Sequence, residues 1–472
     1  AKTGHLPECL TQGDIICLYK KGDPREIRNY RPLTMLQVGY KVYARILVNR
    51  LKTRITKVIS PAQLGFVPGR IINEASHLLK LIQAYTDEMD QEGIILALDW
   101  EKAFDRVSWE YMHEAMHALN MGEEAIAKMG LLSNTKFPPT RRVKANGKKS
   151  NPFNIRSGVP QGCPFSPLAF LLVAEALTRM LEEGVDIDGQ HVRPEGIQIT
   201  DPDDRSLLVE LVASLFADDT QALLKDYAQI DKLWIILQIY EEATGMRANP
   251  NKFEGIRLGP LKHQPPPTLN GRSRLIKWLE RGSYTKILGI PYYLEETQEE
   301  SNKFWEELYT KIKVSMASLR GLKDMKITGR ALVANFKIFS RPRYWAFTMD
   351  PPEWFNEQLI TDVNHLMWDK HPALDPEEEG SYEDLDRAPW IKNPHAPRRL
   401  EWSAGGGTPP KHELIGLGVA LCDWEQHVKA IRAKALLRYL DASRGQYKTL
   451  LDLWLARAEI GRSSVLTSCK AH

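Results

Sequence analysis

Three aspartates lie at the ends of short apolar segments that have the length and composition of buried β-strands. Asp99 follows the apolar run 93–98, and Asp218 and Asp219 separate two apolar runs between 211 and 224. The first pattern predicts a buried strand that ends in a carboxylate, and the second predicts a hairpin with acids at its tip. Because neighbouring buried carboxylates repel one another and lose solvation, a fold that gathers them must also neutralise their charge.

Divalent cations are one way to neutralise such a group of acids. Two metal ions about 3.5–4 Å apart can bind the attacking and leaving oxygens of a phosphoryl transfer. Mg²⁺ prefers carboxylate and phosphate oxygens and keeps some of its water, so a few aspartates and a substrate phosphate suffice. An ordinary turn accounts for the same residues, because Asp is common in turns.

A glycine- and proline-rich segment, Ser157 to Pro164, opens the apolar helix predicted for 166–182. Its backbone can approach a nucleotide or a strand closely, and the Gln161 side chain can hydrogen-bond to it. A plain turn at the start of a helix is the alternative interpretation.

The composition excludes several classes of protein. With 43% hydrophobic and 26% charged residues, the 472-residue chain is too apolar for a disordered protein. Five cysteines, at 9, 17, 163, 422 and 469, form no CxxC pair, which disfavours a disulfide framework or a zinc finger and favours a reducing compartment. No apolar run approaches the ~20 residues needed to cross a bilayer. The chain starts at Ala1 without a signal sequence, and whether it is a piece of a longer protein is open.

Charge is distributed unevenly along the chain. The formal net charge is only +3, but eleven Lys or Arg against two acids give residues 20–57 a charge of +9. Residues 311–345 carry nine bases and one acid, whereas 375–386 carry seven acids and no base. The two basic blocks predict surfaces that bind a phosphate backbone.

Hydrophobic periodicity predicts a mixed α and β protein. A helix at 37–58 would place Val38, Val42, Ile46, Leu47 and Leu51 on one face. Further helices are predicted at 71–92, 109–118, 166–182, 233–244, 303–345 and 424–457, with strands at 14–19 and 286–293 and a hairpin turn at Asn146-Gly147. The acidic and Gly/Pro-rich segment 371–413 has the composition of an irregular linker.

Six short motifs occur in the order and spacing of those of one enzyme family. They are Tyr30-Arg31-Pro32-Leu33, Leu64 to Arg70, Leu98 to Val107, Gly158 to Gly162, Phe216-Ala217-Asp218-Asp219 and Leu288-Gly289-Ile290. Through them, over residues 6–295, the chain resembles the reverse transcriptases of non-LTR (LINE-type) retrotransposons. A weaker similarity begins at Gly416, and the acidic and Gly/Pro-rich insertion before it departs from the compact family pattern.

This resemblance implies an α+β fold of the right-hand polymerase type. The fingers would occupy 1–92, and the palm, with its antiparallel sheet, would occupy 93–295, with part of the fingers around 110–155. A helical thumb would follow at 296–370. The linker 371–413 would then lead to a mostly helical post-thumb region at 414–472.

The resemblance also implies RNA-directed DNA synthesis. Asp99, Asp218 and Asp219 match the palm aspartates that hold two Mg²⁺ ions, for which Mn²⁺ can substitute, and the main-chain carbonyl of Trp100 is an additional ligand. The 3′ hydroxyl of a primer would attack the α-phosphate of a dNTP, and pyrophosphate would leave. Lys252 matches a family lysine proposed to protonate that pyrophosphate; a solvated surface lysine is the alternative.

Contacts to the dNTP are implied for five residues. Phe104 matches the bulky side chain that lies under the sugar and excludes a 2′ hydroxyl, although from the sequence alone a core aromatic is the simpler interpretation. Lys20, Lys21 and Arg31 would grip the triphosphate, with Arg suited to bidentate contact. Gln161 would also contact the nucleotide. The sequence does not choose between the two lysines.

Template and primer contacts are implied from the fingers to the thumb. Arg70 would touch the template strand. The other residues expected to contact template or primer are Gly158, Pro160, Gly162, Leu288, Gly289, Lys326, Arg330 and Lys337. The last three belong to the basic block 311–345, whose aromatic residues we expect mostly to pack as helix core.

Two other functions stay open from the sequence. An intron-type maturase uses a similar fold chiefly to bind structured RNA, but it usually has Tyr at the position of Phe216. A domesticated, non-catalytic scaffold would have no need of all three aspartates. The expected partners are an RNA template, a DNA primer or target DNA and dNTPs, without a membrane. In target-primed synthesis an endonuclease domain or protein outside this chain would make the primer, and we expect nuclear action after cytoplasmic synthesis.

Overall fold

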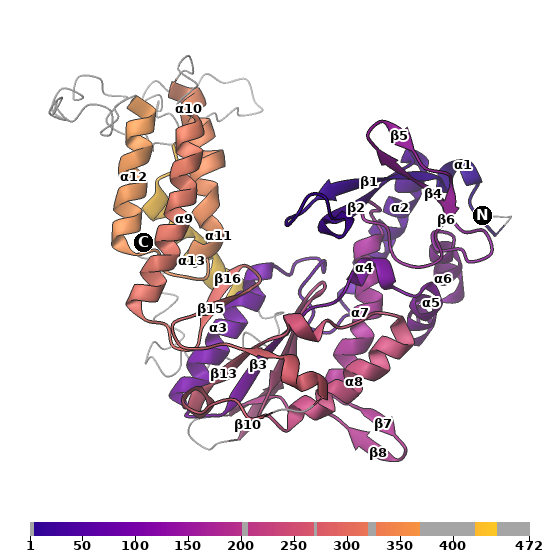
Figure 1. Cartoon of the computed structure of the whole chain (residues 1–472), viewed down its shortest axis with the longest axis horizontal. Coiled ribbons are helices and arrows are strands. Elements are labelled where there is room, and N and C mark those ends of the chain that lie inside the picture. The colour runs from indigo at the N-terminus through magenta and orange to yellow at the C-terminus, as the bar shows by residue number, and fades with distance from the viewer. Residues whose placement is uncertain (1–3, 201–205, 269–270, 320–326, 369–420, 441–472) are drawn as a thin grey trace, which may run out of the picture. The chain divides into compact units, whose positions relative to one another are not determined.

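The computed structural model of the chain describes residues 4–200, 206–268, 271–319, 327–368 and 421–440. These residues form two compact units, one that ends at Leu294 and one that begins at Glu295 (Figure 1). The first unit contains two larger sheets with helices packed on them, and the second consists of helices. The mixed α+β class expected from the sequence is confirmed.

The central sheet of the first unit has the strand order β11-β12-β3-β13-β14. Its middle strand, β3 (Gly93–Leu98), pairs antiparallel with β12 (Asp219–Leu224) and with β13 (Glu254–Leu258). The outer strands are β11 (Ala213–Phe216) and β14 (Lys277–Trp278). The strand and the hairpin predicted beside the aspartates are therefore confirmed, and they are neighbours in one sheet.

Both faces of β3 are covered, which explains its unbroken apolar run. Ile94 and Leu96 belong to the main core, together with side chains of helices α7 (Ser166–Glu183) and α8 (Gln229–Thr244). Ile95 points to the other face, since successive strand residues alternate, and is equally buried. Both helices confirm those predicted from the sequence.

A second sheet in the first unit has the order β2-β1-β4-β5. β1 (Gly13–Tyr19) lies between β2 (Tyr30–Leu36), to which it is antiparallel, and β4 (Thr140–Ala145), to which it is parallel. The sequence predicts only β1 of these three, because β2 and β4 are rich in polar and basic residues and lack a clear alternation.

The predicted Asn146-Gly147 turn joins β4 to β5 (Lys148–Lys149). Both turn residues have positive φ, 49° and 76°, as a two-residue hairpin turn requires. The last strand of this sheet, β6 (Phe153–Asn154), also pairs with β4.

Helix α2 (Val38–Ile55) confirms the helix predicted from residue 37 onward, but of the five residues predicted for its buried face only Leu47 and Leu51 are buried. Val38, Val42 and Ile46 are exposed, with 76%, 55% and 47% of their surface accessible. The buried face consists of Tyr40, Ala44, Leu47, Val48, Leu51 and Ile55. The prediction followed aliphatic residues alone, whereas the helix buries the aromatic Tyr40, and this fixes its rotation.

The predicted strand at 286–293 is a hairpin of two short strands. β15 (Tyr284–Ile287) and β16 (Ile290–Tyr293) pair antiparallel around a two-residue turn. Leu288 and Gly289 in that turn have φ values of 51° and 79°. A continuous strand is impossible with two consecutive left-handed residues, so that prediction is wrong.

The remaining elements of the first unit are mostly short. Helices α3 (Ile72–Glu88) and α5 (Trp109–Ala118) confirm two predicted helices. The others are α1 (Glu8–Thr11), α4 (Ala103–Arg106), α6 (Glu123–Gly130), β7 (Val185–Ile187), β8 (Gln190–Val192), β9 (Ile197–Thr200) and β10 (Leu207–Leu211).

The second unit packs its helices around large aromatic side chains. Trp305, Phe355 and Trp424 are fully buried, and Trp305 contacts Phe355 with ring centroids 4.7 Å apart. The helices are α9 (Gln298–Leu319), α10 (Ile327–Ala334), a π-helical turn η5 (Asn335–Phe339), α11 (Ser340–Ala346), α12 (Glu353–Trp368) and α13 (Trp424–Leu440).

Three of the predicted segments lie wholly or partly outside the described residues. The linker predicted at 371–413 lies wholly outside them, the helix predicted at 303–345 is described except for 320–326, and the helix predicted at 424–457 is described only as far as Leu440. Among the helices that the structure describes, none is both long and apolar enough to cross a membrane.

Candidate active site

The three aspartates come together at one end of the central sheet. The pairing of β3 with β12 reaches Leu98 and Thr220, and Asp99 and Asp219 are the next residues on the two strands. Residues at opposite positions of an antiparallel pair have Cα atoms about 5 Å apart. Asp218 precedes Asp219 in the turn that joins β11 to β12, so all three carboxylates share this end of the sheet.

The turn that carries Asp218 is as short as a hairpin turn can be. Phe216 pairs with Asp219, so only Ala217 and Asp218 lie between the strands. A turn of this length needs positive φ at its first central residue, and Ala217 has a φ of 59°. This left-handed conformation is sterically unfavourable for a residue with a Cβ atom, so the position of Asp218 depends on a strained neighbour.

The surroundings disfavour negative charge on both aspartates of the turn. Their side chains reach solvent, yet burial is the largest influence and raises the pKa of Asp218, and the nearby Asp99 carboxylate raises it further. Burial together with Asp218 and Asp99 raises the pKa of Asp219 to about 6. A cation placed among these oxygens would relieve the repulsion, so the donor set suits a divalent metal ion.

The carboxylate of Asp99 forms an ion pair with Lys252. The Nζ atom of Lys252 donates to Oδ2 of Asp99 at 2.9 Å. Lys252 ends the helical turn Pro250–Lys252, and the main-chain N–H of Asn249, just before it, donates to the Asp99 carbonyl at 2.8 Å. The backbone therefore holds Lys252 beside the carboxylates.

In the part of the chain that the structure describes, no three His, Cys, Asp or Glu side chains are spaced to enclose a metal ion by themselves. Mg²⁺ does not need such a group, because it usually binds through one or two carboxylates, substrate phosphates and water. The aspartates are thus suited to a metal that arrives with a nucleotide.

The main-chain carbonyl of Trp100, predicted as an additional metal ligand, points away from the chain segment around Ala248 that pairs with it. Trp100 forms an isolated antiparallel bridge with Ala248, and the hydrogen bonds of that bridge belong to Asp99 and Glu101. In such a bridge the central residue turns its own N–H and C=O to the opposite side. The indole Nε1 donates to Oγ1 of Thr220 at 3.1 Å, which fixes the side chain against β12.

The glycine-rich segment packs tightly against α4 at its first glycine. The N–H of Gly158 donates to the Val107 carbonyl at 2.8 Å. Gly158 has a φ of 80°, and a Cβ atom there would lie 2.5 Å from the carbonyl oxygen of Asp105. Glycine is required at this position by both conformation and space.

The other end of this segment packs against β2. The Thr34 N–H donates to the Gln161 carbonyl at 2.7 Å, and a Cβ at Gly162 would lie 2.5 Å from the Thr34 carbonyl oxygen. The carbonyl of Pro160 accepts from the Ser166 hydroxyl at 2.8 Å, which ties the segment to the start of α7. The side chain of Gln161 is half-buried and makes no hydrogen bond to any described residue.

Phe104 is held from both sides by aromatic rings. It stacks on Phe170 of α7, with ring centroids 4.5 Å apart, and meets the edge of Phe66 at 6.4 Å. Phe104 is half-buried, whereas Phe66 is exposed. The ring is thus rigidly placed but still partly accessible, as a side chain that meets a substrate must be.

Two of the three basic residues predicted to bind the triphosphate are close enough to the aspartates for their charge to lower a carboxylate pKa. The charge of Lys20 lowers the pKa of both Asp218 and Asp219, and that of Arg31 lowers the pKa of Asp218. Lys20 follows β1, and Arg31 lies on β2 opposite Leu18. Lys21 has no comparable influence, so the structure favours Lys20 over Lys21.

Comparison with known proteins shows which family the chain belongs to. Residues 19–291, more than half of the chain, match the family model described as reverse transcriptase (RNA-dependent DNA polymerase). The chain belongs to the reverse transcriptase family. Its fold is therefore of the right-hand polymerase type, in which we expect the central sheet with the aspartates to be the palm.

The curated relatives of this reverse transcriptase are proteins of mobile elements. The transposon TX1 149 kDa protein of Xenopus laevis is 28% identical over 369 residues, which cover 78% of this chain and 26% of that protein. The RNA-directed DNA polymerase of the mobile element jockey from Drosophila melanogaster is 26% identical over 281 residues, 57% of this chain and 28% of that protein. These relatives identify a non-LTR, LINE-type reverse transcriptase, and the chain spans about a quarter of their length.

A solved structure of telomerase from Candida tropicalis in complex with a fragment of telomeric RNA is also similar. It covers 95% of this chain and 65% of that one, at 9% identity and a TM-score of 0.43.

Arg70 of the reverse transcriptase, predicted to touch the template, organises its own loop. Its guanidinium donates to the carbonyls of Ile59, Ser60 and Gln63. These bonds give Arg70 a structural task, and a contact with the template stays a prediction.

The predicted template and primer contacts in the second unit differ in their surroundings. Lys326 lies outside the described residues. Arg330 donates to the Met367 carbonyl at 3.2 Å, which ties α10 to α12. Lys337 in η5 is exposed and forms no ion pair within the described residues. In the first unit, Leu288 and Gly289, which are also predicted to contact template or primer, form the turn between β15 and β16.

The sequence interpretation missed Gln63 and Glu175, two buried polar residues; Gln63 contacts the turn that carries Asp218. Glu175 interrupts the apolar run of α7, and its carboxylate accepts from the Ser60 N–H at 2.9 Å. A charged residue in an otherwise apolar helix could have been recognised from the sequence as a buried residue that needs a partner. Gln63 carries no such signal, because a lone glutamine next to a loop motif is unremarkable.

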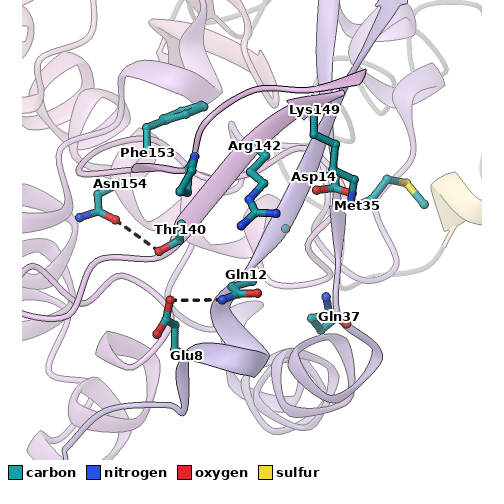
Figure 2. Close-up of a pocket in the computed structure, with 12 residues that line it drawn as sticks. Glu8, Gln12, Asp14, Met35, Gln37, Thr140, Arg142, Lys149, Phe153 and Asn154 are labelled. Carbon is teal, nitrogen blue, oxygen red and sulfur yellow. Dashed lines mark hydrogen bonds and ion pairs between the residues drawn. The ribbon is translucent and has the colours of Figure 1, made fainter. Parts of the chain in front are cut away.

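A separate polar pocket of about 410 Å³ is lined by residues of the β2-β1-β4-β5 sheet and of α1 (Figure 2). It is lined by Gly13 and Asp14 at the start of β1, whereas Lys20 follows the other end of that strand, about 20 Å away. Arg142 points into it, and Asp14 forms an ion pair with Lys149 at 2.8 Å. The pocket is therefore distinct from the site of the carboxylates.

Proposed function

We propose that this chain catalyses RNA-templated DNA synthesis through two Mg²⁺ ions held by Asp99, Asp218 and Asp219. The observation that carries the proposal is the meeting of these three carboxylates at one end of the palm sheet, where β3 ends and the β11–β12 turn lies. Bound metal ions would activate the primer 3′ hydroxyl and neutralise the charge that develops on the triphosphate.

The remaining residues bind and orient the substrates. Lys20 and Arg31 face the carboxylates and meet the triphosphate, and the half-buried ring of Phe104 lies under the sugar. Gln161 offers a side-chain amide without a protein partner among the described residues. Lys252, held beside Asp99 at 2.9 Å, donates a proton to the leaving pyrophosphate.

The second unit offers a basic surface for the template and primer. Its exposed Lys and Arg side chains on α9, η5 and α11 are Lys303, Lys311, Lys313, Lys337, Arg341 and Arg343. Arg341 donates to the Lys311 carbonyl at 3.4 Å, so α9 and α11 present these charges together. Such a surface suits a phosphate backbone, and we infer that this unit is the thumb.

The relatives extend the proposal to the biological reaction. Because they are named as proteins of mobile elements, we infer that this chain copies an element RNA onto a primer made at the target DNA, with Mn²⁺ able to replace Mg²⁺. An endonuclease domain or protein outside the chain makes that primer, and the reaction takes place in the nucleus.

Primer extension tests the proposal directly. The chain is incubated with a heteropolymeric RNA template, an annealed DNA primer, four dNTPs and Mg²⁺, and the product is sequenced. We expect a DNA complement of the template that does not form in EDTA. Absence of template-dependent product with both Mg²⁺ and Mn²⁺ would refute the proposal.

A further inference from the structure

The loop around Gln63 lies directly against the catalytic hairpin. Gln63 forms an isolated parallel bridge with Leu215 of β11. The Leu215 N–H donates to the Ala62 carbonyl at 2.8 Å, and the Leu64 N–H donates to the Leu215 carbonyl at 2.7 Å. The loop thus extends the palm sheet beyond its outer strand, next to the turn that carries the aspartates.

The side chain of Gln63 binds both polar groups of one turn residue. Its Oε1 accepts from the Ala217 N–H at 3.0 Å and from the Gly65 N–H at 2.9 Å. Its Nε2 donates to the Ala217 carbonyl at 3.4 Å. Gln63 is fully buried, so water does not compete for these bonds.

The residue that Gln63 holds is the strained one. Ala217 has the left-handed φ of 59° and immediately precedes Asp218. A non-glycine residue keeps such a conformation only when its surroundings impose it. The Gln63 amide supplies that constraint through hydrogen bonds on both sides of the Ala217 Cα atom.

Gly65 supplies a steric constraint on the same turn. A Cβ atom at Gly65 would lie 2.2 Å from the Ala217 nitrogen, so the two backbones are in direct contact. Any side chain at Gly65 would push the turn away from the loop.

The loop itself is anchored to helix α7, so it can act as a fixed support. The Ser60 N–H donates to Glu175 at 2.9 Å, and the Ser60 hydroxyl donates to Glu182 at 2.9 Å. Arg70 binds three carbonyls of the loop, including that of Gln63. The contacts form a continuous path from α7 through Ser60 and Gln63 to the catalytic turn.

We propose that Gln63 is a positioning residue, which fixes the conformation of Ala217 and thereby the direction in which Asp218 and Asp219 present their carboxylates to metal. This inference rests on the proposed function. It adds a residue that touches neither metal nor substrate but sets the geometry of two residues that do.

The test compares Gln63→Met with Gln229→Met. Gln229 is a matched control, because it is also buried, accepts from the Glu195 N–H at 3.0 Å and donates to Asp226 at 3.1 Å, away from the catalytic turn. Two quantities are measured: kcat for primer extension, and the Mn²⁺ concentration at the midpoint of the Mn²⁺-induced rise in Tm.

For Gln63→Met we expect kcat to fall ~10- to 100-fold, the scale of a misplaced catalytic group. The Mn²⁺ midpoint should rise about tenfold, as when a residue that orients a metal ligand is lost. The KM for primer–template should be unchanged, and Gln229→Met should match the wild type in all three quantities. Equal kcat and equal Mn²⁺ midpoints in the two variants would overturn the inference.

A second pair of variants keeps the inference testable if Gln63→Met does not fold. Gly65→Ala displaces the turn, whereas Gly196→Ala creates a similar clash, 2.3 Å from the Leu211 carbonyl oxygen, at a distant hairpin. We expect only Gly65→Ala to lower kcat and raise the Mn²⁺ midpoint, and equal behaviour of the pair overturns the inference. Failure of the proposed function is distinguishable, because the wild type itself would then not extend a primer.

Discussion

The ammonium group of Lys252 lies 2.9 Å from the carboxylate of Asp99, although 153 residues separate the two along the chain. The pair is accessible to solvent, with 61% of the Lys252 side chain and 39% of the Asp99 side chain exposed. An ion pair so exposed contributes little stability. Under the proposed function its significance is positional, because it would place a proton donor beside a carboxylate that we expect to bind metal.

Two substitutions of Lys252 separate proton donation from charge pairing. Lys252→Met removes both, and we expect kcat to fall ~10²-fold or more, the usual contribution of a general acid. Lys252→Arg keeps a positive charge near Asp99, but guanidinium does not release its proton near neutral pH. Single-nucleotide incorporation by rapid quench should therefore show both variants impaired; an Arg variant as fast as the wild type would show that only the charge matters.

The raised pKa of Asp219 makes stability depend on pH when divalent ions are chelated. The value is about 6 in the folded protein against 3.8 for an unperturbed Asp, so the folded state holds the proton more tightly. The free energy of unfolding attributable to this group therefore falls as the pH rises from about 4 to about 6 and is constant above that window.

Thermal melting in EDTA checks this sign. Between pH 4.5 and 7 the Tm of Asp219→Asn should increase relative to the wild type, because the variant lacks the group that becomes unfavourably charged. The effect should be modest, since Asp219 reaches solvent. Parallel Tm curves for the two proteins would contradict the assignment.

Lys20 and Lys21 form a natural pair of test and control for nucleotide binding. Lys20 acts on the pKa of both turn aspartates, whereas Lys21 does not. We expect Lys20→Ala to raise the KM for dNTP ~10-fold, the scale of a charged hydrogen bond to phosphate, and Lys21→Ala to leave it nearly unchanged. Steady-state kinetics on a homopolymeric template would measure both, and the reverse order would contradict the placement of Lys20 beside the aspartates.

Phe104 should determine the choice of sugar. Its ring is fixed by Phe170 at 4.5 Å and by Phe66 at 6.4 Å, so it cannot turn aside for a 2′ hydroxyl. Phe104→Val should increase the ratio of rNTP to dNTP incorporation ~10- to 100-fold. Phe170→Leu serves as a control for loosened packing, and an equal increase in that variant would show that the ring does not act by direct contact.

The sequence was most informative where chemistry and local geometry coincide. The strand before Asp99 and the hairpin around Asp218 could be predicted because buried strands are short apolar runs and hairpin tips are polar. The Asn146-Gly147 turn could also be predicted, because few residue pairs accept two positive φ values.

The errors arose where long-range packing decides. Which face of α2 is buried depends on Tyr40, whose hydroxyl lies 3.5 Å from the carbonyl of Leu132, 92 residues away. The same limit applies to Gln63, whose partner Ala217 is 154 residues distant. No local sequence pattern contains those long-range contacts. Nor does any local pattern show that Lys20, rather than Lys21, faces the carboxylates.

The most direct test of the central claim compares Asp218→Asn with Asp188→Asn in single-nucleotide incorporation on an RNA template. Asp188 also lies in a hairpin turn, between β7 and β8, with a φ of 49°, and therefore controls for the loss of a turn aspartate. With Mg²⁺, Asp218→Asn should lose activity on the order of 10³-fold, as when one main charge-stabilising group is removed, and Asp188→Asn should match the wild type. If Asp218→Asn incorporates nucleotides as fast as Asp188→Asn, the carboxylates of the palm are not the catalytic centre.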